Sequence, residues 1–390
     1  MTRDQPRVLL TIAVYNGREF MDRTLRSAAA LDQTGIDLDV LVLDDASPAP
    51  GFADELSAAC AHHGFWYYRS PRNQGLVRSL NVAMRWAQAE RYDHVILANS
   101  DVVYPANLAV GMVGAAESDP RCGAVVSWSN NASAFSFLNE DPDLHLPTQE
   151  VVDLISSTFE AEFDGATIEI PCANGFCWLI PVPVIDRVGI HDTVFGRGYC
   201  EETDWSLRAR ASGYKILLAL SVFTYHQGNG SMIEAGVLQT GEKTIDAHEA
   251  VIDMRYPEFR DEVQAFADTG QLQDATERAH QALVRRGASD RGYDLEVGWL
   301  AHEPEVGARP HCFVHPGPLA AHLEVTYLGF RRWVMFDDGD GPAAIRRYFG
   351  ADPTLVTIRD IGPQADRIET AFGRGDSVLD RRVAYPQTVV

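Results

Sequence analysis

Apolar runs alternate with amphipathic stretches through the first half of the chain. Residues 7–14, 40–43 and 94–99 are almost continuously apolar, which is typical of inner parallel strands that are buried on both faces. After each run comes a stretch with helical spacing of apolar residues. The remaining elements that this pattern predicts before residue 226 are strands at 65–69, 123–127, 171–181 and 215–225 and helices at 19–30, 52–62, 76–87, 106–117 and 151–163. The alternation predicts an α/β fold with a mostly parallel sheet covered by helices.

Polar residues follow three of these strands. The triplet Asn99-Ser100-Asp101 starts at the last residue of the run at 94–99. Asp44-Asp45 follows the run at 40–43, and Tyr15 follows the first run. Ligands of open α/β sheets bind outside the carboxyl ends of the strands. A carboxylate such as Asp101 would suit a divalent cation with its diphosphate, and Asp44 and Asp45 could accept hydrogen bonds from a ribose hydroxyl or from a uracil or thymine N–H. The same residue types also favour tight turns.

Further polar clusters follow the irregular stretch 130–164. Asn174-Gly175 interrupts the apolar run at 171–181, where glycine would allow a ligand to approach closely. Three acids in four residues then begin a helix, where they suit either catalysis or the helix dipole: Glu201, Glu202 and Asp204. His226 ends the last strand and could be a core histidine, a turn residue or a metal ligand.

Charge and composition narrow the classes of function. The 390 residues include 33 Lys and Arg against 55 Asp and Glu, a formal net charge of −22, which argues against nucleic-acid and anionic-membrane partners. The loop after the first strand has one glycine rather than G-x-G-x-x-G, which disfavours a dinucleotide-dependent dehydrogenase. Six cysteines without C-x-x-C spacing, no signal-peptide pattern and no apolar run of about 20 residues predict a cytoplasmic protein without a transmembrane segment.

Six motifs, taken in their order along the chain, resemble the family 2 glycosyltransferases of GT-A fold. They are TIAVYNG, DDAS, RNQGLVRSLN, ANSDVV, CEETDWSLRA and YHQGNGS, and the resemblance covers about residues 7–231. The triplet that includes Ser100 stands at the family's D-x-D position, in an N-S-D form that is common among rhamnosyl and related transferases. The resemblance therefore implies a nucleotide diphosphate sugar donor, a UDP- or dTDP-sugar, and a saccharide or small-molecule acceptor.

The resemblance also implies roles for particular residues. Asp101 and His226 are expected to hold Mg or Mn, and Glu202 is expected to be the base that deprotonates the acceptor hydroxyl in an inverting reaction. Glu201 and Asp204 would tune that base or bind sugar hydroxyls. The residues implied in nucleotide and phosphate binding are Thr11, Ala13, Tyr15, Asp44, Asp45, Asn73, Arg78 and Ser100. A nucleotidyltransferase and a catalytically silent nucleotide-sugar-binding protein are the alternatives.

The resemblance fades after about residue 234. We expect a catalytic domain at 1–234, a helical extension at 235–290 with a link near 285–292, and a small α/β region at 291–390. Within that last region the pattern predicts strands at 323–328, 333–336 and 355–358 and helices at 343–349 and 365–372. This region could shape the acceptor site or form a contact in a homo-oligomer.

Overall fold

The computed structural model describes residues 5–132, 136–137, 148–228, 238–298, 309–314, 322–335, 341–358 and 363–373. These residues form two compact units, one up to Ala275 and one from Thr276 onward. In the described ranges, no helix combines the length and the hydropathy that crossing a bilayer requires.

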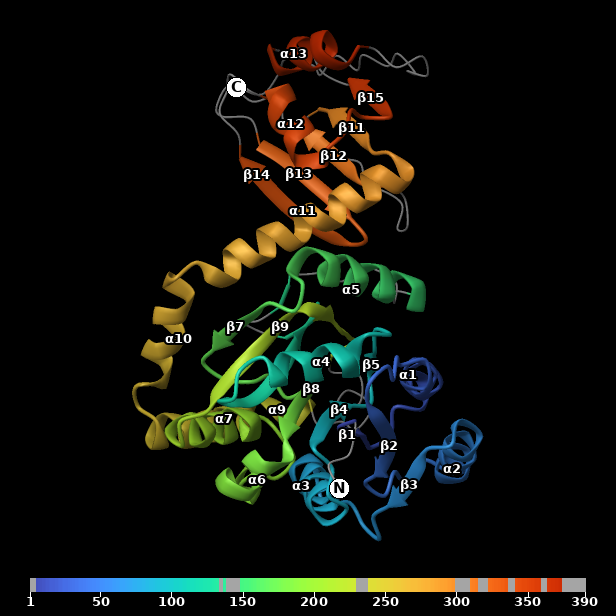
Figure 1. Ribbon diagram of the computed structural model, residues 1–390, viewed down its shortest axis with the longest axis vertical. Coiled ribbons are helices and arrows are strands. Elements are labelled where there is room, and N and C mark those ends of the chain that lie inside the picture. The colour runs from blue at the N-terminus through green and yellow to red at the C-terminus, as the bar shows by residue number, and fades with distance from the viewer. Residues whose placement is uncertain are drawn as a thin grey trace. The chain divides into compact units, whose positions relative to one another are not determined.

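An eight-stranded sheet forms the centre of the first unit (Figure 1). The order of its strands is β3-β2-β1-β4-β8-β6-β9-β7. Their bounds are β1 Arg7–Val14, β2 Asp37–Asp44, β3 Trp66–Arg69, β4 His94–Asn99, β6 Cys122–Trp128, β7 Thr167–Ile170, β8 Cys177–Pro181 and β9 Lys215–Phe223. Strands β3, β2, β1 and β4 are parallel neighbours, as are β6 and β9, whereas β8 and β7 run antiparallel to the strands beside them. The mostly parallel sheet predicted from the apolar runs is confirmed.

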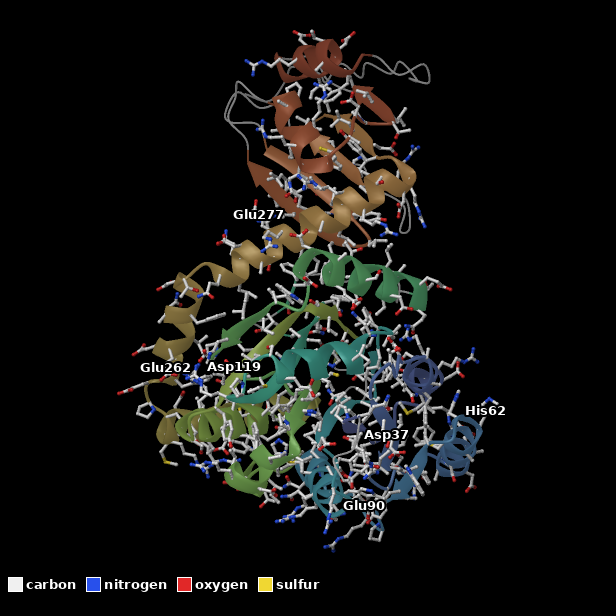
Figure 2. All side chains as sticks on the ribbon, viewed as in Figure 1. Asp37, His62, Glu90, Asp119, Glu262 and Glu277 are labelled. Atoms are coloured by element: carbon white, nitrogen blue, oxygen red, sulfur yellow. The ribbon has the colours of Figure 1, made fainter. Side chains whose placement is uncertain are left out.

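Helices cover both faces of this sheet (Figure 1). Helices α1, α2 and α4 pack on one face, where side chains such as Val8, Leu10 and Ile12 join one buried apolar cluster. Helices α3, α6 and α7 cover the other face. The bounds of the helices are α1 Arg18–Ala29, α2 Phe52–His63, α3 Leu76–Ala89, α4 Leu108–Glu117, α5 Gln149–Phe163, α6 Val182–Val188, α7 Glu201–Ala211, α9 Leu238–Arg255, α10 Phe259–Asp268 and α11 Gln271–Arg291. Charged side chains such as Asp37, His62, Glu90 and Glu262 lie at the exposed surface (Figure 2).

Two predicted strands are shorter than the apolar pattern indicated. The strand expected at 171–181 forms only from Cys177, because the residues around Asn174 and Gly175 form a turn instead. The strand expected at 215–225 ends at Phe223, and Tyr225–His226 becomes the separate strand β10. Strand β10 pairs antiparallel with β5, Val102–Val103, in a two-stranded sheet of its own. As a result, Asn174 and His226 lie outside the strands of the large sheet.

The second unit contains a five-stranded sheet in the order β14-β13-β12-β11-β15. Its elements are β11 Asp294–Val297, β12 His311–Val314, β13 His322–Tyr327, β14 Phe330–Met335, α12 Gly341–Phe349, β15 Leu355–Ile358 and α13 Pro363–Phe372. The link expected near 285–292 is wrong, because α11 continues to Arg291. Leu283, Val284 and Ala288 are buried along that helix, and Arg285 donates to the carbonyls of Arg347 and Tyr348, so packing holds this segment helical.

Candidate active site

A cavity of about 560 Å³ lies at the carboxyl ends of β1, β2 and β4. Ala13 and Tyr15 reach it from the end of β1, and Asp45 from the end of β2. Asn99, Ser100 and Asp101 line it from the end of β4. Further lining residues come from four later segments: Asn131, Asn174, Gly175, Phe176, Arg197, Tyr199, Glu201, Glu202 and His226. The sheet edge thus gathers residues from most of the motifs into one site.

Asp45 ties the end of β2 to the start of α3. Its carboxylate accepts hydrogen bonds from the backbone N–H groups of Gln74 (2.8 Å) and Gly75 (2.7 Å). Asn73 lines the cavity beside these residues. The loop before α3 is therefore held against the part of the cavity formed by β1 and β2, where one carboxylate can serve both the fold and a ligand.

Four of the predicted site residues lie outside the cavity lining. The Thr11 hydroxyl, deeper along β1, is fully buried and donates to the carbonyl of Ile96 (2.9 Å). Asp44 is buried and bonds to Tyr67, Arg69 and the N–H of Ser47, so its lone pairs serve the turn after β2. Asp204 also lies outside the lining, because it belongs to an ion-pair network. Arg78 lies on the outer surface of α3.

The small sheet of β5 and β10 brings Asp101 and His226 together. His226 pairs with Val102 in this sheet, and the N–H of Gln227 donates to the carbonyl of Asp101 (2.9 Å). The His226 Nε2 atom lies 3.5 Å from Oδ1 of Asp101. Two segments far apart in the sequence thereby present a carboxylate and an imidazole to the same cavity.

Neighbouring groups orient the imidazole of His226. Its Nδ1 lies 2.9 Å from the carbonyl oxygen of Asn131 and donates to it, so Nε2 is the ring nitrogen that faces Asp101. The ring stacks on Phe176 with centroids 4.9 Å apart. In the described part of the chain no cluster of three or more His, Cys, Asp or Glu residues gathers around a metal position. A carboxylate and an imidazole are ligand types that Mg²⁺ and Mn²⁺ accept, so this pair would fit such a cation.

The acids Glu201 and Glu202 begin α7 after a constrained loop. Tyr199 and Cys200 both have left-handed backbone angles (φ 70° and 69°), which non-glycine residues rarely adopt. His248 on α9 holds this loop, since its Nδ1 lies 3.0 Å from the carbonyl of Gly198 and 3.2 Å from that of Tyr199. Helix α9 lies in the segment that the sequence assigned to a separate extension, yet it supports the loop of the site.

The two glutamates have different surroundings. Burial, together with the negative charge of Glu202, raises the pKa of Glu201 well above its ordinary value. Its Oε2 atom is buried and has no hydrogen-bond partner in the described structure. Burial also raises the pKa of Glu202, but the N–H groups of Gly175 and Thr203 and its own N–H donate to its carboxylate and oppose that rise. Of the two acids, Glu201 therefore holds its proton more strongly, and Glu202 is the one that ionises first.

This difference predicts a pH-dependent effect of Glu201→Gln on stability. Between the ordinary glutamate pKa of about 4.3 and the raised pKa of Glu201, unfolding releases a proton that the folded protein holds. The contribution of Glu201 to the free energy of unfolding therefore falls as pH rises, by up to about 1.4 kcal/mol per pH unit. The glutamine variant has no such loss, because its amide does not titrate. Urea unfolding at pH 4.5 and pH 7 should show the variant gaining relative to wild type at pH 7. Parallel stability curves would contradict the assignment.

Asp204 belongs to a structural ion-pair network. Its fully buried carboxylate accepts hydrogen bonds from Arg208 (2.9 Å), Arg255 (2.8 Å) and the hydroxyl of Tyr256 (3.0 Å). A buried carboxylate needs such partners, because an unpaired charge in the interior is very unfavourable. The prediction that Asp204 tunes the base or binds sugar hydroxyls is thus not supported by its position, since it links α7 to α9 instead.

The cavity also contains residues that the sequence motifs did not assign to the site. Arg197 is the cation among the lining residues, and Tyr199 lies two positions further along the same loop. The available signal for Arg197 was its place between Gly196 and Gly198, whose φ angles are 47° and 119°. Asn131 lies on a segment whose irregular pattern carried no such signal.

The loops before α3 and α7 are in close contact at Gly75. A Cβ atom on Gly75 would lie 2.7 Å from the carbonyl oxygen of Gly196 and 3.3 Å from Cα of Arg197. The φ angle of Gly75 is 85° with ψ 157°, a conformation that is essentially restricted to glycine. Only glycine allows these two walls of the cavity to approach so closely.

We expect Gly75→Ala to lower the free energy of unfolding by about 1–3 kcal/mol, through both the backbone strain and the clash with Gly196. The matched control is Gly114→Ala, since Gly114 lies in the exposed face of α4 and a Cβ atom added there would meet nothing within 4 Å. The control should be neutral or stabilising by up to about 1 kcal/mol. Urea unfolding of the two variants tests this, and equal stabilities would refute the steric explanation.

The fold and the cavity together define an α/β protein whose ligand site lies at the carboxyl edge of a mostly parallel sheet. Residues 10–189 match the model of the family described as glycosyl transferase family 2. The match spans most of the first unit, so this part of the chain is similar to that family. The resemblance inferred from the ordered motifs, and the α/β fold that it implied, are confirmed.

Similar solved structures include three with low sequence identity. A mannosyltransferase, PcManGT from Pyrobaculum calidifontis in complex with GDP-Man and Mn²⁺, is 18% identical, with coverage of 74% of this chain and 76% of that chain and a TM-score of 0.45. GalNAc-T7 with UDP, GalNAc and Mn²⁺ is 12% identical, with coverage of 86% and 68% and a TM-score of 0.47. TarS 1-349 of S. aureus is 14% identical, with coverage of 72% and 80% and a TM-score of 0.42. No curated protein matches the chain by sequence.

Proposed function

We propose that this protein is a metal-dependent, inverting glycosyltransferase that moves a sugar from a UDP- or dTDP-sugar to a hydroxyl group of a saccharide or small-molecule acceptor. The observation that carries the proposal is a single cavity lined by the Asp101–His226 pair and by Glu202. A pair of cation ligands and a separate carboxylate base are the two functions that direct displacement from a nucleotide diphosphate requires.

The donor nucleotide would occupy the part of the cavity beside β1 and β2. Tyr15 offers a ring against which a base can pack, and Asp45 offers carboxylate oxygens to a ribose hydroxyl or a pyrimidine N–H. Arg197 has no ion-pair partner among the described side chains and is the cation available to the diphosphate. These residues would orient the donor so that the face of its anomeric carbon opposite the leaving group is open to the acceptor.

Asp101 and His226 would hold a Mg²⁺ or Mn²⁺ ion, which when bound neutralises charge on the departing diphosphate. Glu202 accepts the proton of the acceptor hydroxyl as that oxygen forms its bond to the anomeric carbon. The bond between the anomeric carbon and the phosphate oxygen breaks, and its electron pair leaves with the nucleotide diphosphate. Attack opposite the leaving group inverts the configuration. The backbone N–H groups that donate to the carboxylate of Glu202, and that oppose the rise of its pKa, support this role.

A thermal-shift screen of nucleotide sugars with and without Mn²⁺ tests the proposal. A donor present at 100 times its Kd should raise the free energy of unfolding by about 2.7 kcal/mol. At equal concentrations, the donors therefore rank by their affinity. We expect UDP- or dTDP-sugars to give the largest shifts, and the shifts to shrink when EDTA is added. Stabilisation by purine nucleotide sugars alone would overturn the donor assignment, and the absence of any shift would overturn the donor site.

A further inference from the structure

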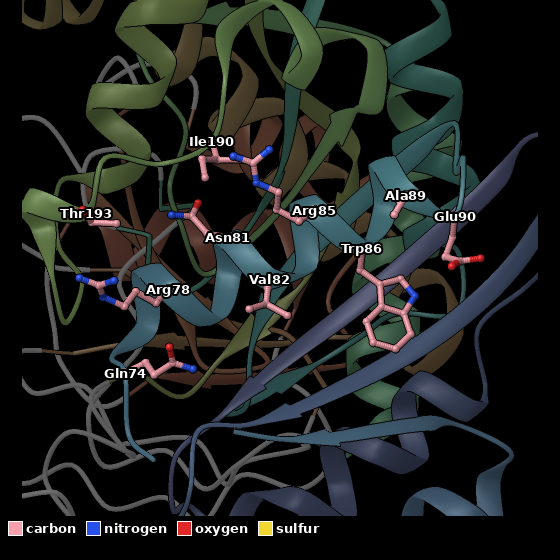
Figure 3. A pocket seen from close by; sticks show the side chains of 10 residues that line it. All are labelled: Gln74, Arg78, Asn81, Val82, Arg85, Trp86, Ala89, Glu90, Ile190 and Thr193. Atoms are coloured by element: carbon pink, nitrogen blue, oxygen red, sulfur yellow. The ribbon is translucent and has the colours of Figure 1, made fainter. Parts of the chain in front are cut away.

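A groove of the first unit, separate from the cavity, runs along the outer face of α3 (Figure 3). It is an open groove of about 590 Å³. One side is α3 itself, and the other is the segment that follows α6. The residues used below are Arg78, Arg85 and Trp86 on α3, with Ile190 and Thr193 across the groove.

The two arginines are placed to act together. Arg78 and Arg85 are seven residues apart, so they lie on the same face of the helix, about 10 Å apart along its axis. Both are exposed, and within the described chain neither is paired with a carboxylate. Figure 3 shows their guanidinium groups on the side of the helix where Thr193 and Ile190 lie. Two unpaired cations in one groove form an anion-recognition surface.

The two sides of the groove are joined by a buried hydrogen-bonded pair. Asn81 Nδ2 donates to the carbonyl of His191 (3.0 Å), and the N–H of His191 donates back to Asn81 Oδ1 (2.9 Å). Asn81 and His191 are both buried. The spacing between α3 and the opposite segment is therefore set before any ligand binds, which lowers the entropic cost of binding.

The charge of the whole protein makes these arginines unusual. With a net charge of −22, the molecule repels anions at long range, so recognition of an anion has to be local. Glu90 is the carboxylate of this groove, and it lies near the C-terminal end of α3, away from Arg78 (Figure 3). Trp86 is half-buried between these ends and offers a flat apolar surface with an N–H group, which suits the face of a sugar ring.

The groove begins beside the donor cavity. Gln74 lines the groove, while Asn73 and Gly75 on either side of it line the cavity. The N–H of Gln74 also donates to the cavity residue Asp45 (2.8 Å). The start of α3 also meets the loop that precedes Glu201, since a Cβ atom on Gly198 would lie 3.2 Å from Leu76 and 4.0 Å from Oε2 of Glu201. A ligand that lies along α3 would thus end beside the cavity.

We propose that this groove binds the anionic portion of an extended saccharide acceptor, with Arg78 and Arg85 each taking a carboxylate or phosphate group and Trp86 lying against a sugar ring. The inference rests on the proposed glycosyltransferase function, because it names the class of acceptor. The spacing of the two arginines requires at least two anionic groups about 10 Å apart.

Calorimetric titration of the full chain, without donor or metal, tests the inference with three probes. They are a galacturonate oligosaccharide, a mannose oligosaccharide carrying phosphate groups, and neutral maltotetraose. We expect one anionic probe to bind at least tenfold more tightly than maltotetraose, and the better one identifies carboxylate or phosphate as the recognised group. The double variant Arg78→Ala/Arg85→Ala should weaken that binding at least tenfold.

The matched control is Arg26→Ala/Arg187→Ala, which removes two positive charges from exposed helix positions outside the groove. It should bind the anionic probe like wild type, and melting temperatures should show that both double variants are folded. Equal binding of neutral and anionic probes, or equal weakening by both double variants, would overturn the inference. Competition by UDP would overturn it too, since the site would then belong to the donor. Because no donor or metal is present, failure of the proposed donor site would leave this result unaffected.

Discussion

Glu202→Gln should lower kcat by roughly 100-fold or more while donor affinity stays close to that of wild type. The amide keeps the size of the side chain but cannot accept the proton of the acceptor hydroxyl, and general-base catalysis is typically worth about 10²- to 10⁴-fold. The carboxylate is held by the N–H groups of Gly175 and Thr203, so its loss removes a positioned base rather than a mobile one. Initial rates with saturating donor and calorimetric titration of the donor measure the two effects separately.

Glu201→Gln is the matched control for this experiment. Its carboxyl group is already protonated when Glu202 is ionised, so the neutral amide changes the charge of the site little, and the fall in kcat should be much smaller. The wild-type rate should also decline as pH falls through the raised pKa of Glu202, because protonation removes the base. If Glu201→Gln were inactive and Glu202→Gln normal, the base would be Glu201. Full activity of both variants would exclude the mechanism.

Asp101→Ala should abolish transfer and weaken nucleotide binding chiefly when Mg²⁺ or Mn²⁺ is present. The variant removes the carboxylate that faces Nε2 of His226, and a single imidazole is a poor site for a hard cation. Nucleotide titrations of wild type and variant, each with Mn²⁺ and with EDTA, measure this effect. The nucleotide affinities of the two proteins should differ when Mn²⁺ is present and should be similar in EDTA.

Asp54→Ala is the control for the loss of one negative charge, because Asp54 is exposed on α2 and lies outside the cavity lining. It should retain both transfer and metal-dependent nucleotide binding. Undiminished turnover of Asp101→Ala, or full activity of the wild-type protein in EDTA, would remove the metal role from the mechanism.

The amino-acid sequence determined the local elements and the edge of the sheet at which the site forms. Strand β1 begins and ends where the apolar run predicted, and β4 does the same, because inner parallel strands must be apolar on both faces. The polar residues directly after these strands, such as Tyr15 and Asp101, necessarily emerge at the carboxyl edge. The ordered motifs were sufficient to predict the family whose model matches residues 10–189.

The tertiary structure alone decided which polar residues face the cavity. Thr11, Asp44 and Asp204 stand in the same motifs as residues that line it, yet each turns toward partners inside the fold. Periodicity along a strand or helix tells which face is buried, but not which distant group will satisfy a buried hydroxyl or carboxylate.

The pairing of β5 with β10 and the contact of Gly75 with Gly196 also depend on tertiary structure. Both join segments that are far apart in the sequence, and neither leaves a periodic signal in the chain. The first brings Asp101 to His226, and the second places Arg197 beside the start of α3. Contacts of this kind form because the packed sheet and helices bring the loops together, so the individual residues of the site follow from the fold, whereas its location follows from the sequence.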